Sequence, residues 1–320
     1  MQYFVIDAGW YKQPDVSWDL SMGDYEPSKA LFKDGLEETV KYINDAGMKA
    51  GLWFEIDNVG SASKAYTDEK HLLKRDGHVL TTTSRRFWDL RQKEVKDILK
   101  ERVIGTLKRY GFEYLKIDCN DTVGIGCDGA ESLGEGLRQN QEASSGFVRT
   151  IKEDIPGIII ENCASGGHKT EPLMMSLCSM ASFSDSHECE EIPVIAANLH
   201  RVILPRQSQI WAVLRKTDSP KRTAYSVINT FLGRMCLSGF MGIFREDCEK
   251  QKAYALFYGF NRMKGKKAEI RIPAGYRISE IYSYKEEMIG LHNEEDDSLH
   301  NVLEYTFDED MKAVAVLMEK

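Results

Sequence analysis

Apolar residues occur along this chain in two alternating patterns. Short runs of consecutive apolar residues predict buried strands, and longer stretches with an apolar residue every three or four positions predict amphipathic helices. The predicted strands are residues 3–7, 49–55, 114–118, 157–162, 180–185, 209–214 and 236–242. The predicted helices are residues 35–47, 93–110, 137–154, 194–200, a helix from Arg222 and a helix from Asp247 onward. This alternation predicts a parallel sheet covered by helices.

Polar residues stand repeatedly at the C-terminal ends of the predicted strands. They are Asp7, Glu55, Asp118, Glu161 with Asn162, and Asp185. A (β/α)8 barrel of the TIM type places its active site at this end of its strands. An open doubly wound sheet more often has a glycine-rich phosphate turn after its first strand, and no GxGxxG motif occurs there. Only seven strands are predicted, and the chain begins directly inside one, so we expect the true first strand to lie upstream of Met1.

The pattern changes character from about residue 267. Residues 267–275, 276–284, 302–307 and 312–319 alternate as antiparallel strands do, and the acidic segment 292–301 is predicted to be a loop between two of them. We therefore predict a catalytic barrel domain over residues 1–264 and a small antiparallel β-sandwich domain over residues 265–320.

Composition restricts the partners that the chain can have. A hydrophobic content of 42% over 320 residues predicts a globular fold, and a net charge of -8 gives no reason to expect nucleic acid or an anionic membrane as partner. No apolar run reaches the roughly 20 residues of a membrane span, and residues 1–10 do not resemble a signal peptide. The seven cysteines are scattered without CxxC pairs, which argues against disulfides and structural zinc. We expect a cytoplasmic protein.

Asp118 and Asp185 are the acids that best suit a reaction centre. Each ends a strand of otherwise apolar character, and two carboxylates at one face of a barrel are what glycoside hydrolysis needs. A separation of about 5 to 5.5 Å would indicate retention of configuration, and about 6.5 to 9.5 Å inversion. Lys116, two residues before Asp118 on the same strand face, would favour its ionised form. Cys119 should point to the opposite face.

The sequence alone leaves other roles open for these residues. A single strand-end Asp is as often a helix cap or a turn former. Trp10, Trp53 and Trp88 can stack on a sugar or pack in the core. No His is placed as a base for Cys163, so we do not assign this thiol as a nucleophile.

We also predict no metal site. Oxygen and imidazole ligands could converge from Asp118, Asn120, Asp121, His168, His187 and Glu188. However, HxH and HExxH spacings are absent, and this set would suit only a weak site with oxygen ligands.

Five segments together resemble glycoside hydrolase family 36, the α-galactosidase family. They are FVIDAGWY, GMKAGLWFE, YLKIDCN, IIENCASGG and SFSDSHE, and they occur in the family's order between Met1 and about Arg245. The resemblance implies a retaining mechanism with Asp118 as nucleophile and Asp185 as acid/base, without metal or organic cofactor. It further implies that a set of matching positions lines the sugar subsite: Asp7, Trp53, Arg85, Lys116, Asn120 and Cys163.

The sequence also departs from the family's pattern. Ala8 follows Asp7 where many members have a second acid, so α-galactosides are the first expected substrates and α-N-acetylgalactosaminides the second. The large N-terminal β-sandwich of the family is not present, which predicts a truncated enzyme. Transglycosylation and a sugar-binding remnant without catalysis remain alternatives. We expect an oligosaccharide or α-galactoside as partner and leave homo-oligomer formation open.

Overall fold

The structure is a computed structural model of the chain. It describes residues 2–183, 190–215, 217–239, 252–259, 264–283, 287, 289–294, 297–308 and 312–319. The chain divides into two compact units, Met1–Ala181 and Ser182–Lys320. Among the described residues, no helix has both the length and the apolar character that a membrane span requires.

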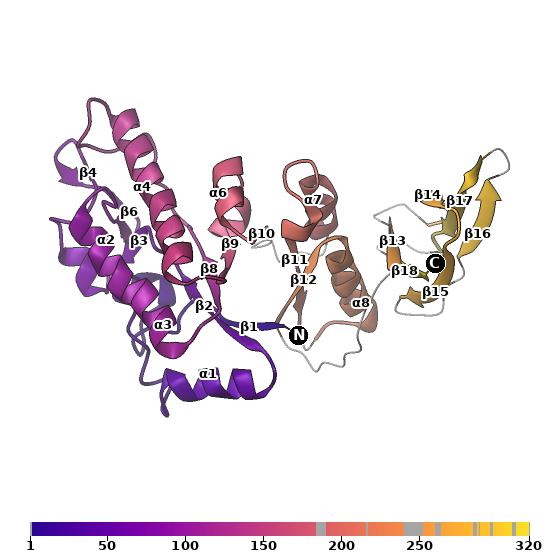
Figure 1. The fold of residues 1–320 in the computed structure, drawn as a ribbon, viewed down its shortest axis with the longest axis horizontal. Coiled ribbons are helices and arrows are strands. Elements are labelled where there is room, and N and C mark those ends of the chain that lie inside the picture. The colour runs from indigo at the N-terminus through magenta and orange to yellow at the C-terminus, as the bar shows by residue number, and fades with distance from the viewer. Residues whose placement is uncertain are drawn as a thin grey trace. The chain divides into compact units, whose positions relative to one another are not determined.

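A parallel sheet forms the centre of the first unit (Figure 1). Its strands follow one another in the order β1 (Tyr3–Ile6), β2 (Lys49–Phe54), β8 (Tyr114–Ile117), β9 (Ile159–Asn162) and β10 (Met180–Ser182). All four strand pairs are parallel, and Lys116 of β8 lies level with Trp53 of β2 and Glu161 of β9. The C-terminal ends of the strands therefore meet at one edge of the sheet, where the sequence places its polar residues.

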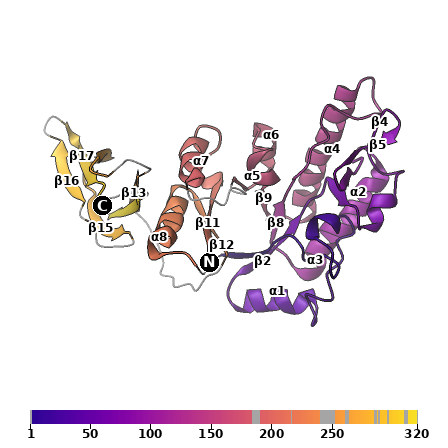
Figure 2. The ribbon, with the colours of Figure 1, turned by 180° about the vertical axis from the view of Figure 1, so that it is seen from behind.

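Helices connect these strands. They are α1 (Leu36–Asp45), α2 (Lys93–Leu99), the π-helical η3 (Lys100–Gly105), α3 (Thr106–Tyr110), α4 (Leu133–Asp154), α5 (Ala164–Gly167) and α6 (Pro172–Leu177). In α1, Leu36, Val40 and Ile43 are buried, which is the spacing of one helix face. The segments α2, η3 and α3 follow one another end to end as one helical stretch, which lies beside α4 (Figures 1 and 2). The predicted strand and helix alternation of this unit is confirmed.

Short elements extend from the strand ends of the first unit. They are η1 (Trp18–Leu20), η2 (Lys64–Thr67), β3 (Asn58–Gly60), β4 (Lys74–Arg75), β5 (His78–Val79), β6 (Thr81–Thr82) and β7 (Arg85–Phe87). Strands β3, β7 and β6 pair in this order as a small antiparallel sheet. This small sheet carries Arg85 and Asn58 to the strand ends of β2 and β8.

The second unit begins with helices and two further parallel strands. They are α7 (Glu191–Leu199), η4 (Pro205–Gln207), β11 (Ser208–Leu214), α8 (Pro220–Asn229), η5 (Thr230–Leu232) and β12 (Arg234–Gly239). Strands β11 and β12 pair in parallel. The helices predicted at residues 194–200 and from Arg222 are confirmed, as are the described parts of both predicted strands.

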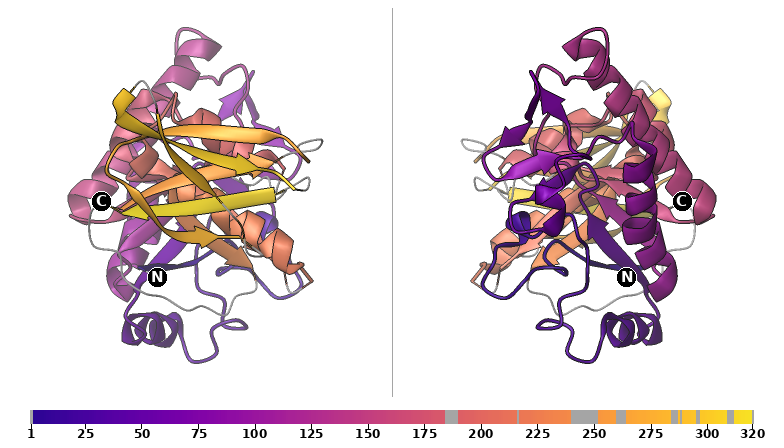
Figure 3. Two further views of the ribbon diagram at one scale, coloured as in Figure 1. Left: turned by 90° about the vertical axis from the view of Figure 1, so that its right-hand side faces the viewer. Right: turned by 90° about the vertical axis from the view of Figure 1, so that its left-hand side faces the viewer.

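Two antiparallel sheets complete the second unit, and their strands are coloured orange to yellow in Figure 3. One has the order β13 (Lys252–Gly259), β18 (Lys312–Glu319), β15 (Arg277–Tyr282). The other has the order β14 (Lys267–Pro273), β17 (Asp297–Thr306), β16 (Gly290–Glu294). Phe257, Leu303 and Val316 from both sheets share one apolar core. The predicted β-sandwich is confirmed.

Two expectations for this unit are wrong. Residues 252–259 belong to the helix predicted from Asp247, but they form β13 and pair along their whole length with β18. The acidic segment 292–301 was expected as a loop, but residues 292–294 and 297–301 lie in β16 and β17. At residues 252–259 pairing with the distant β18 overrides the local pattern, whereas β16 and β17 are consecutive strands that pair with each other. The predicted domain boundary after residue 264 stays a prediction, and β13 precedes it.

Candidate active site

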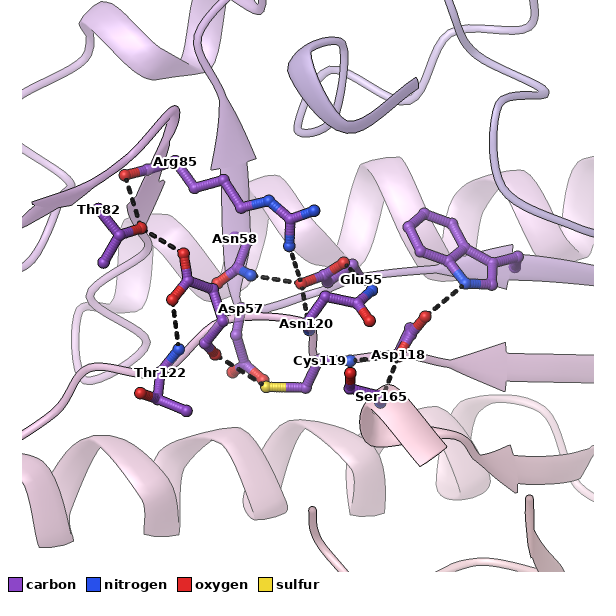
Figure 4. A network of polar contacts seen from close by, with 12 residues as sticks. Glu55, Asp57, Asn58, Thr82, Arg85, Asp118, Cys119, Asn120, Thr122 and Ser165 are labelled. Carbon is purple, nitrogen blue, oxygen red and sulfur yellow. Dashed lines mark hydrogen bonds and ion pairs between the residues drawn. The ribbon is translucent and has the colours of Figure 1, made fainter. Parts of the chain in front are cut away.

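Asp118 follows the last residue of β8, and its carboxylate is held by N–H donors (Figure 4). The backbone N–H groups of Cys119 and Ser165 each donate to Oδ1 over 2.8 Å, and the indole Nε1 of Trp53 donates to Oδ2 over 3.2 Å. Asp118 is only 6% exposed. Hydrogen bonds to a charged acceptor are the strong ones, so these donors both stabilise the carboxylate and fix its orientation.

The donor from Ser165 depends on an unusual turn after β9. Ala164, Ser165, Gly166 and Gly167 have consecutive positive φ angles of 47°, 53°, 80° and 124°. Such angles are costly for residues other than glycine, and backbone strain of this kind clusters at functional sites. The turn brings the backbone N–H of Ser165 to Asp118. Cys163, which begins the turn, is fully buried, and its N–H donates to the Ile117 carbonyl.

Lys116 is a buried cation on β8. Its Nζ lies 3.1 and 3.0 Å from the two carboxylate oxygens of Asp7, which follows β1. Burial works against the ammonium charge, but the charges of Glu161 and Asp7 outweigh it and raise the pKa of Lys116 above its ordinary value. Lys116 is therefore charged at neutral pH and connects the ends of β1 and β8.

Glu55 is the centre of a second polar network (Figure 4). Its Oε1 accepts from the Asn120 backbone N–H over 2.7 Å, from Arg85 over 3.1 Å and from the Asn58 amide. Its Oε2 accepts from the Asn120 side-chain amide over 2.9 Å. Burial raises the pKa of Glu55 to about 7, against the opposing effect of Arg85 and with a further increase from Asp118.

For the three strand-end tryptophans, stacking on a sugar and packing in the core were both open from sequence, and in the structure all three are buried. Trp10, Trp53 and Trp88 are at most 2% exposed. The Trp53 ring stacks with Tyr11 at 5.9 Å and meets Trp18 edge-on at 5.6 Å, while Trp10 donates to the Trp53 carbonyl over 2.8 Å. In this structure Trp53 therefore presents its N–H edge to Asp118, and its ring faces are taken by its aromatic neighbours.

Cys119 points away from Asp118, as strand alternation predicts (Figure 4). It lines a cavity of about 260 Å³ together with Asp57 and Lys169. Lys169 Nζ lies 2.7 Å from Asp57, and Ser144 donates to the other oxygen of this carboxylate over 2.8 Å. Burial raises the pKa of the Cys119 thiol to about 12. Asp121 accepts from the Thr122 N–H over 2.8 Å and from the Thr82 hydroxyl.

The structure thus brings most of the sequence-predicted site residues to one strand edge. Asp118 contacts Trp53 directly, Lys116 contacts Asp7, and Arg85 and Asn120 meet at Glu55. Asp185, the predicted acid/base, lies outside the described residues and stays a prediction.

The predicted set of site residues omitted Glu55 and Ser165. Glu55 is an acid at a strand end, which is the pattern that identified the other candidates. However, its four hydrogen-bond donors come from three other segments of the chain. Ser165 contributes its backbone N–H, and the identity of a side chain does not predict where the backbone N–H points. Among the described residues, no three His, Cys, Asp or Glu side chains are grouped as metal ligands would be.

Comparison with known proteins finds relatives of similar sequence that are named α-galactosidases. α-Galactosidase Mel36A of Lactobacillus acidophilus is 27% identical over 172 residues, which cover 52% of this chain and 23% of that protein. An α-galactosidase of Escherichia coli is 22% identical over 268 residues, or 81% of this chain and 37% of that protein. The chain thus matches less than two thirds of each relative.

Solved structures of α-galactosidases have a fold similar to that of this chain. A variant of α-galactosidase AgaA of Geobacillus stearothermophilus, solved with raffinose, superimposes with a TM-score of 0.75 at 15% identity. The match covers 100% of this chain and 51% of that one. This likeness confirms the expected (β/α) barrel type of fold. The sequence model of the Melibiase family matches residues 1–249 of the 320, and the chain therefore belongs to this family.

Proposed function

We propose that this chain carries the catalytic machinery of a retaining α-galactosidase. The observation that carries the proposal is the buried Asp118 carboxylate at the end of β8, oriented by N–H donors from Trp53, Cys119 and Ser165. Relatives named α-galactosidase in both comparisons support the choice of sugar. Raffinose and stachyose, each found in the structure of a variant of α-galactosidase AgaA, are the oligosaccharides to try first.

In the proposed reaction, an Asp118 oxygen attacks the anomeric carbon of the galactoside. The bond from this carbon to the leaving oxygen breaks, Asp185 gives its proton to that oxygen, and a glycosyl ester forms on Asp118. Asp185, now ionised, then takes a proton from water, whose oxygen attacks the same carbon and releases Asp118. Two inversions leave the α-configuration unchanged.

The residues around Asp118 have proposed binding roles. Charged Lys116 and the carboxylate of Asp7, whose side chain is 55% exposed, are suited to hydrogen-bond sugar hydroxyl groups. Arg85, Asn120, Trp53 and Cys163 complete the proposed subsite. Ala8 beside Asp7 supplies no second carboxylate, and this difference favours α-N-acetylgalactosaminides as the second candidate substrates.

A panel of nitrophenyl α-glycosides tests the proposal. We expect the 320-residue chain to release nitrophenol from the α-galactoside, with α-galactose as the first product by NMR. Asp118→Ala should lower kcat by at least about a thousandfold because no nucleophile remains. Saturable sugar binding without turnover would instead support the sugar-binding alternative, and product analysis at high acceptor concentration would reveal transglycosylation.

Two properties of the chain remain proposals. All cysteines that the structure describes are free, which supports a reducing compartment such as the cytoplasm. Cell fractionation with an antibody against the chain would test this location. Homo-oligomer formation would be tested by light scattering of the purified chain.

A further inference from the structure

Glu55 is fully buried directly after β2, and it accepts hydrogen bonds from three segments. Asn58 reaches it from β3, Arg85 from β7, and Asn120 from the segment after β8 with both its backbone and its side-chain N–H groups. Only an ionised carboxylate accepts from all of these groups at once, because a protonated acid or an amide would turn a donor toward one of them.

The groups that Glu55 holds are those proposed to contact the sugar. Asn120 stands two residues after Asp118, so the bond from its backbone N–H also fixes the peptide between Cys119 and Asn120, one residue beyond the proposed nucleophile. Arg85 lies on a strand of three residues, its side chain is 11% exposed, and Glu55 is its ion-pair partner. The ion pair with Glu55 and the position of the guanidinium 5.8 Å from the centre of the Trp18 ring together restrict the rotamers of Arg85.

We infer that Glu55 is a positioning residue, whose carboxylate sets the side chains of Asn120 and Arg85 in the sugar subsite without itself touching the sugar. This inference rests on the proposed function, since it assumes that Asn120 and Arg85 contact substrate. It adds Glu55 to the residues on which sugar binding depends, and it predicts a change of KM with pH that the proposed reaction does not contain.

The surroundings of Glu55 determine how it responds to pH. The groups that act on its charge or feel it are Arg85, Asp118, Tyr11, Tyr25 and Cys119. Burial is the largest influence and raises the pKa of Glu55 to about 7. As the pH falls through 7, Glu55 takes up a proton and loses the charge that pairs with Arg85, and a proton on Oε2 turns a donor toward the side-chain amide of Asn120. The KM of the wild-type chain should therefore rise on acidification from pH 8 to pH 6.

The test compares Glu55→Gln, Asn120→Ala and the double variant on nitrophenyl α-galactoside, with far-UV circular dichroism as a check of folding. Each single variant should raise KM by about tenfold, the effect of losing a hydrogen bond to a charged group. Both substitutions remove the hydrogen bonds between Glu55 and Asn120. The KM of the double variant should therefore be no higher than that of the single variant with the higher KM. The KM of Glu55→Gln should also lose its change between pH 8 and pH 6.

Asp57→Asn is the matched control. Asp57 is a partly buried acid two residues away that pairs with Lys169 and does not bond to Asn120 or Arg85 in the described structure. The effect of Asp57→Asn on KM should multiply with that of Asn120→Ala, as for independent sites. The KM of Asp57→Asn should still change between pH 8 and pH 6. The wild-type pH profile is measured independently of any variant, so it decides the matter even if Glu55→Gln does not fold.

Several outcomes would overturn the inference. One is an effect of Glu55→Gln that multiplies fully with that of Asn120→Ala, and another is a wild-type KM that is constant between pH 8 and pH 6. Binding of methyl α-galactoside, a neutral ligand, separates this failure from that of the proposed function. If the wild-type chain neither binds it nor turns over any α-galactoside, the proposed function fails before variants are compared.

Discussion

Lys116 keeps its charge inside the protein because acids surround it. Its side chain is only 5% exposed, Asp7 lies 3.0 Å away, and Glu161 contributes the largest favourable charge effect on its pKa. A buried charge held by neighbouring charges of opposite sign need not stabilise the fold, but removing it leaves a buried partner such as Glu161 without compensation.

Lys116→Met should therefore destabilise the chain strongly. Glu161 is 2% exposed and would lose its neighbouring positive charge, at a cost of about 3 kcal/mol in the free energy of unfolding. Urea unfolding measures this cost. Lys49→Met is the control, since Lys49 is paired with Glu113 in an exposed position on the adjacent strand β2 and should change stability little. Equal losses for the two variants would contradict the prediction.

Glu55 also links stability to pH. Its folded-state pKa of about 7 lies above its ordinary value of 4.5, so the folded chain binds a proton more tightly than the unfolded chain. The corresponding stabilisation is complete below pH 4.5 and is lost as the pH rises through 7. The difference is about 3 kcal/mol.

Glu55→Gln has no such titration, which gives a direct measurement. Relative to this variant, the wild-type chain should lose about 3 kcal/mol of unfolding free energy between pH 4.5 and pH 7.5. Chemical denaturation of both proteins across this range provides the comparison. A difference between them that stays constant, or that grows in favour of the wild type as the pH rises, would refute the assignment.

Among the elements, the small sheet of β3, β7 and β6 has the clearest connection to the site, because β7 carries Arg85. Gly60 ends β3 and pairs with Arg85. A Cβ at residue 60 would lie 2.4 Å from the Leu20 carbonyl oxygen, a distance that real contacts do not reach. The backbone of this sheet can approach the preceding loop only with glycine at this position.

Gly60→Ala should accordingly shift β3 and, through it, Arg85. We expect a loss of about 1 to 3 kcal/mol in stability and a raised KM for α-galactosides. Gly146→Ala is the matched control, since Gly146 lies in α4 with open space around the added methyl group and should gain up to about 1 kcal/mol. Thermal unfolding and KM together check both expectations, and an unchanged Gly60→Ala variant would contradict them.

At the scale of the whole molecule, each unit has its own apolar core. In the second unit, Leu303 of β17 is fully buried among residues of both antiparallel sheets. Leu303→Ala should cost about 2 to 5 kcal/mol, because transfer free energy is lost and a cavity remains. Lys267→Ala, at an exposed position on the adjacent β14, should leave urea unfolding near that of the wild type. Similar midpoints for both variants would show that this core contributes little.

Much of this protein could be predicted from sequence, because periodicity reports which face of an element is buried. The alternation of strands and helices, the barrel type of fold, the sandwich at the end and the strand-end position of Asp118 all follow from local pattern or from ordered motifs. Pattern was insufficient at residues 252–259, where apolar and aromatic residues suit either element and pairing with β18 makes the strand.

The tertiary structure decided what the strand-end residues do for one another. Glu55 and Asn120 are 65 positions apart and Glu55 and Arg85 are 30 apart, so no local pattern could place them at one carboxylate. The left-handed turn that brings the Ser165 N–H to Asp118, and the burial of the Trp53 ring faces, likewise depend on packing. The sequence by itself determined which residues could carry chemistry. Long-range packing determined which of them share hydrogen bonds, because donors and acceptors meet only where the fold brings distant segments together.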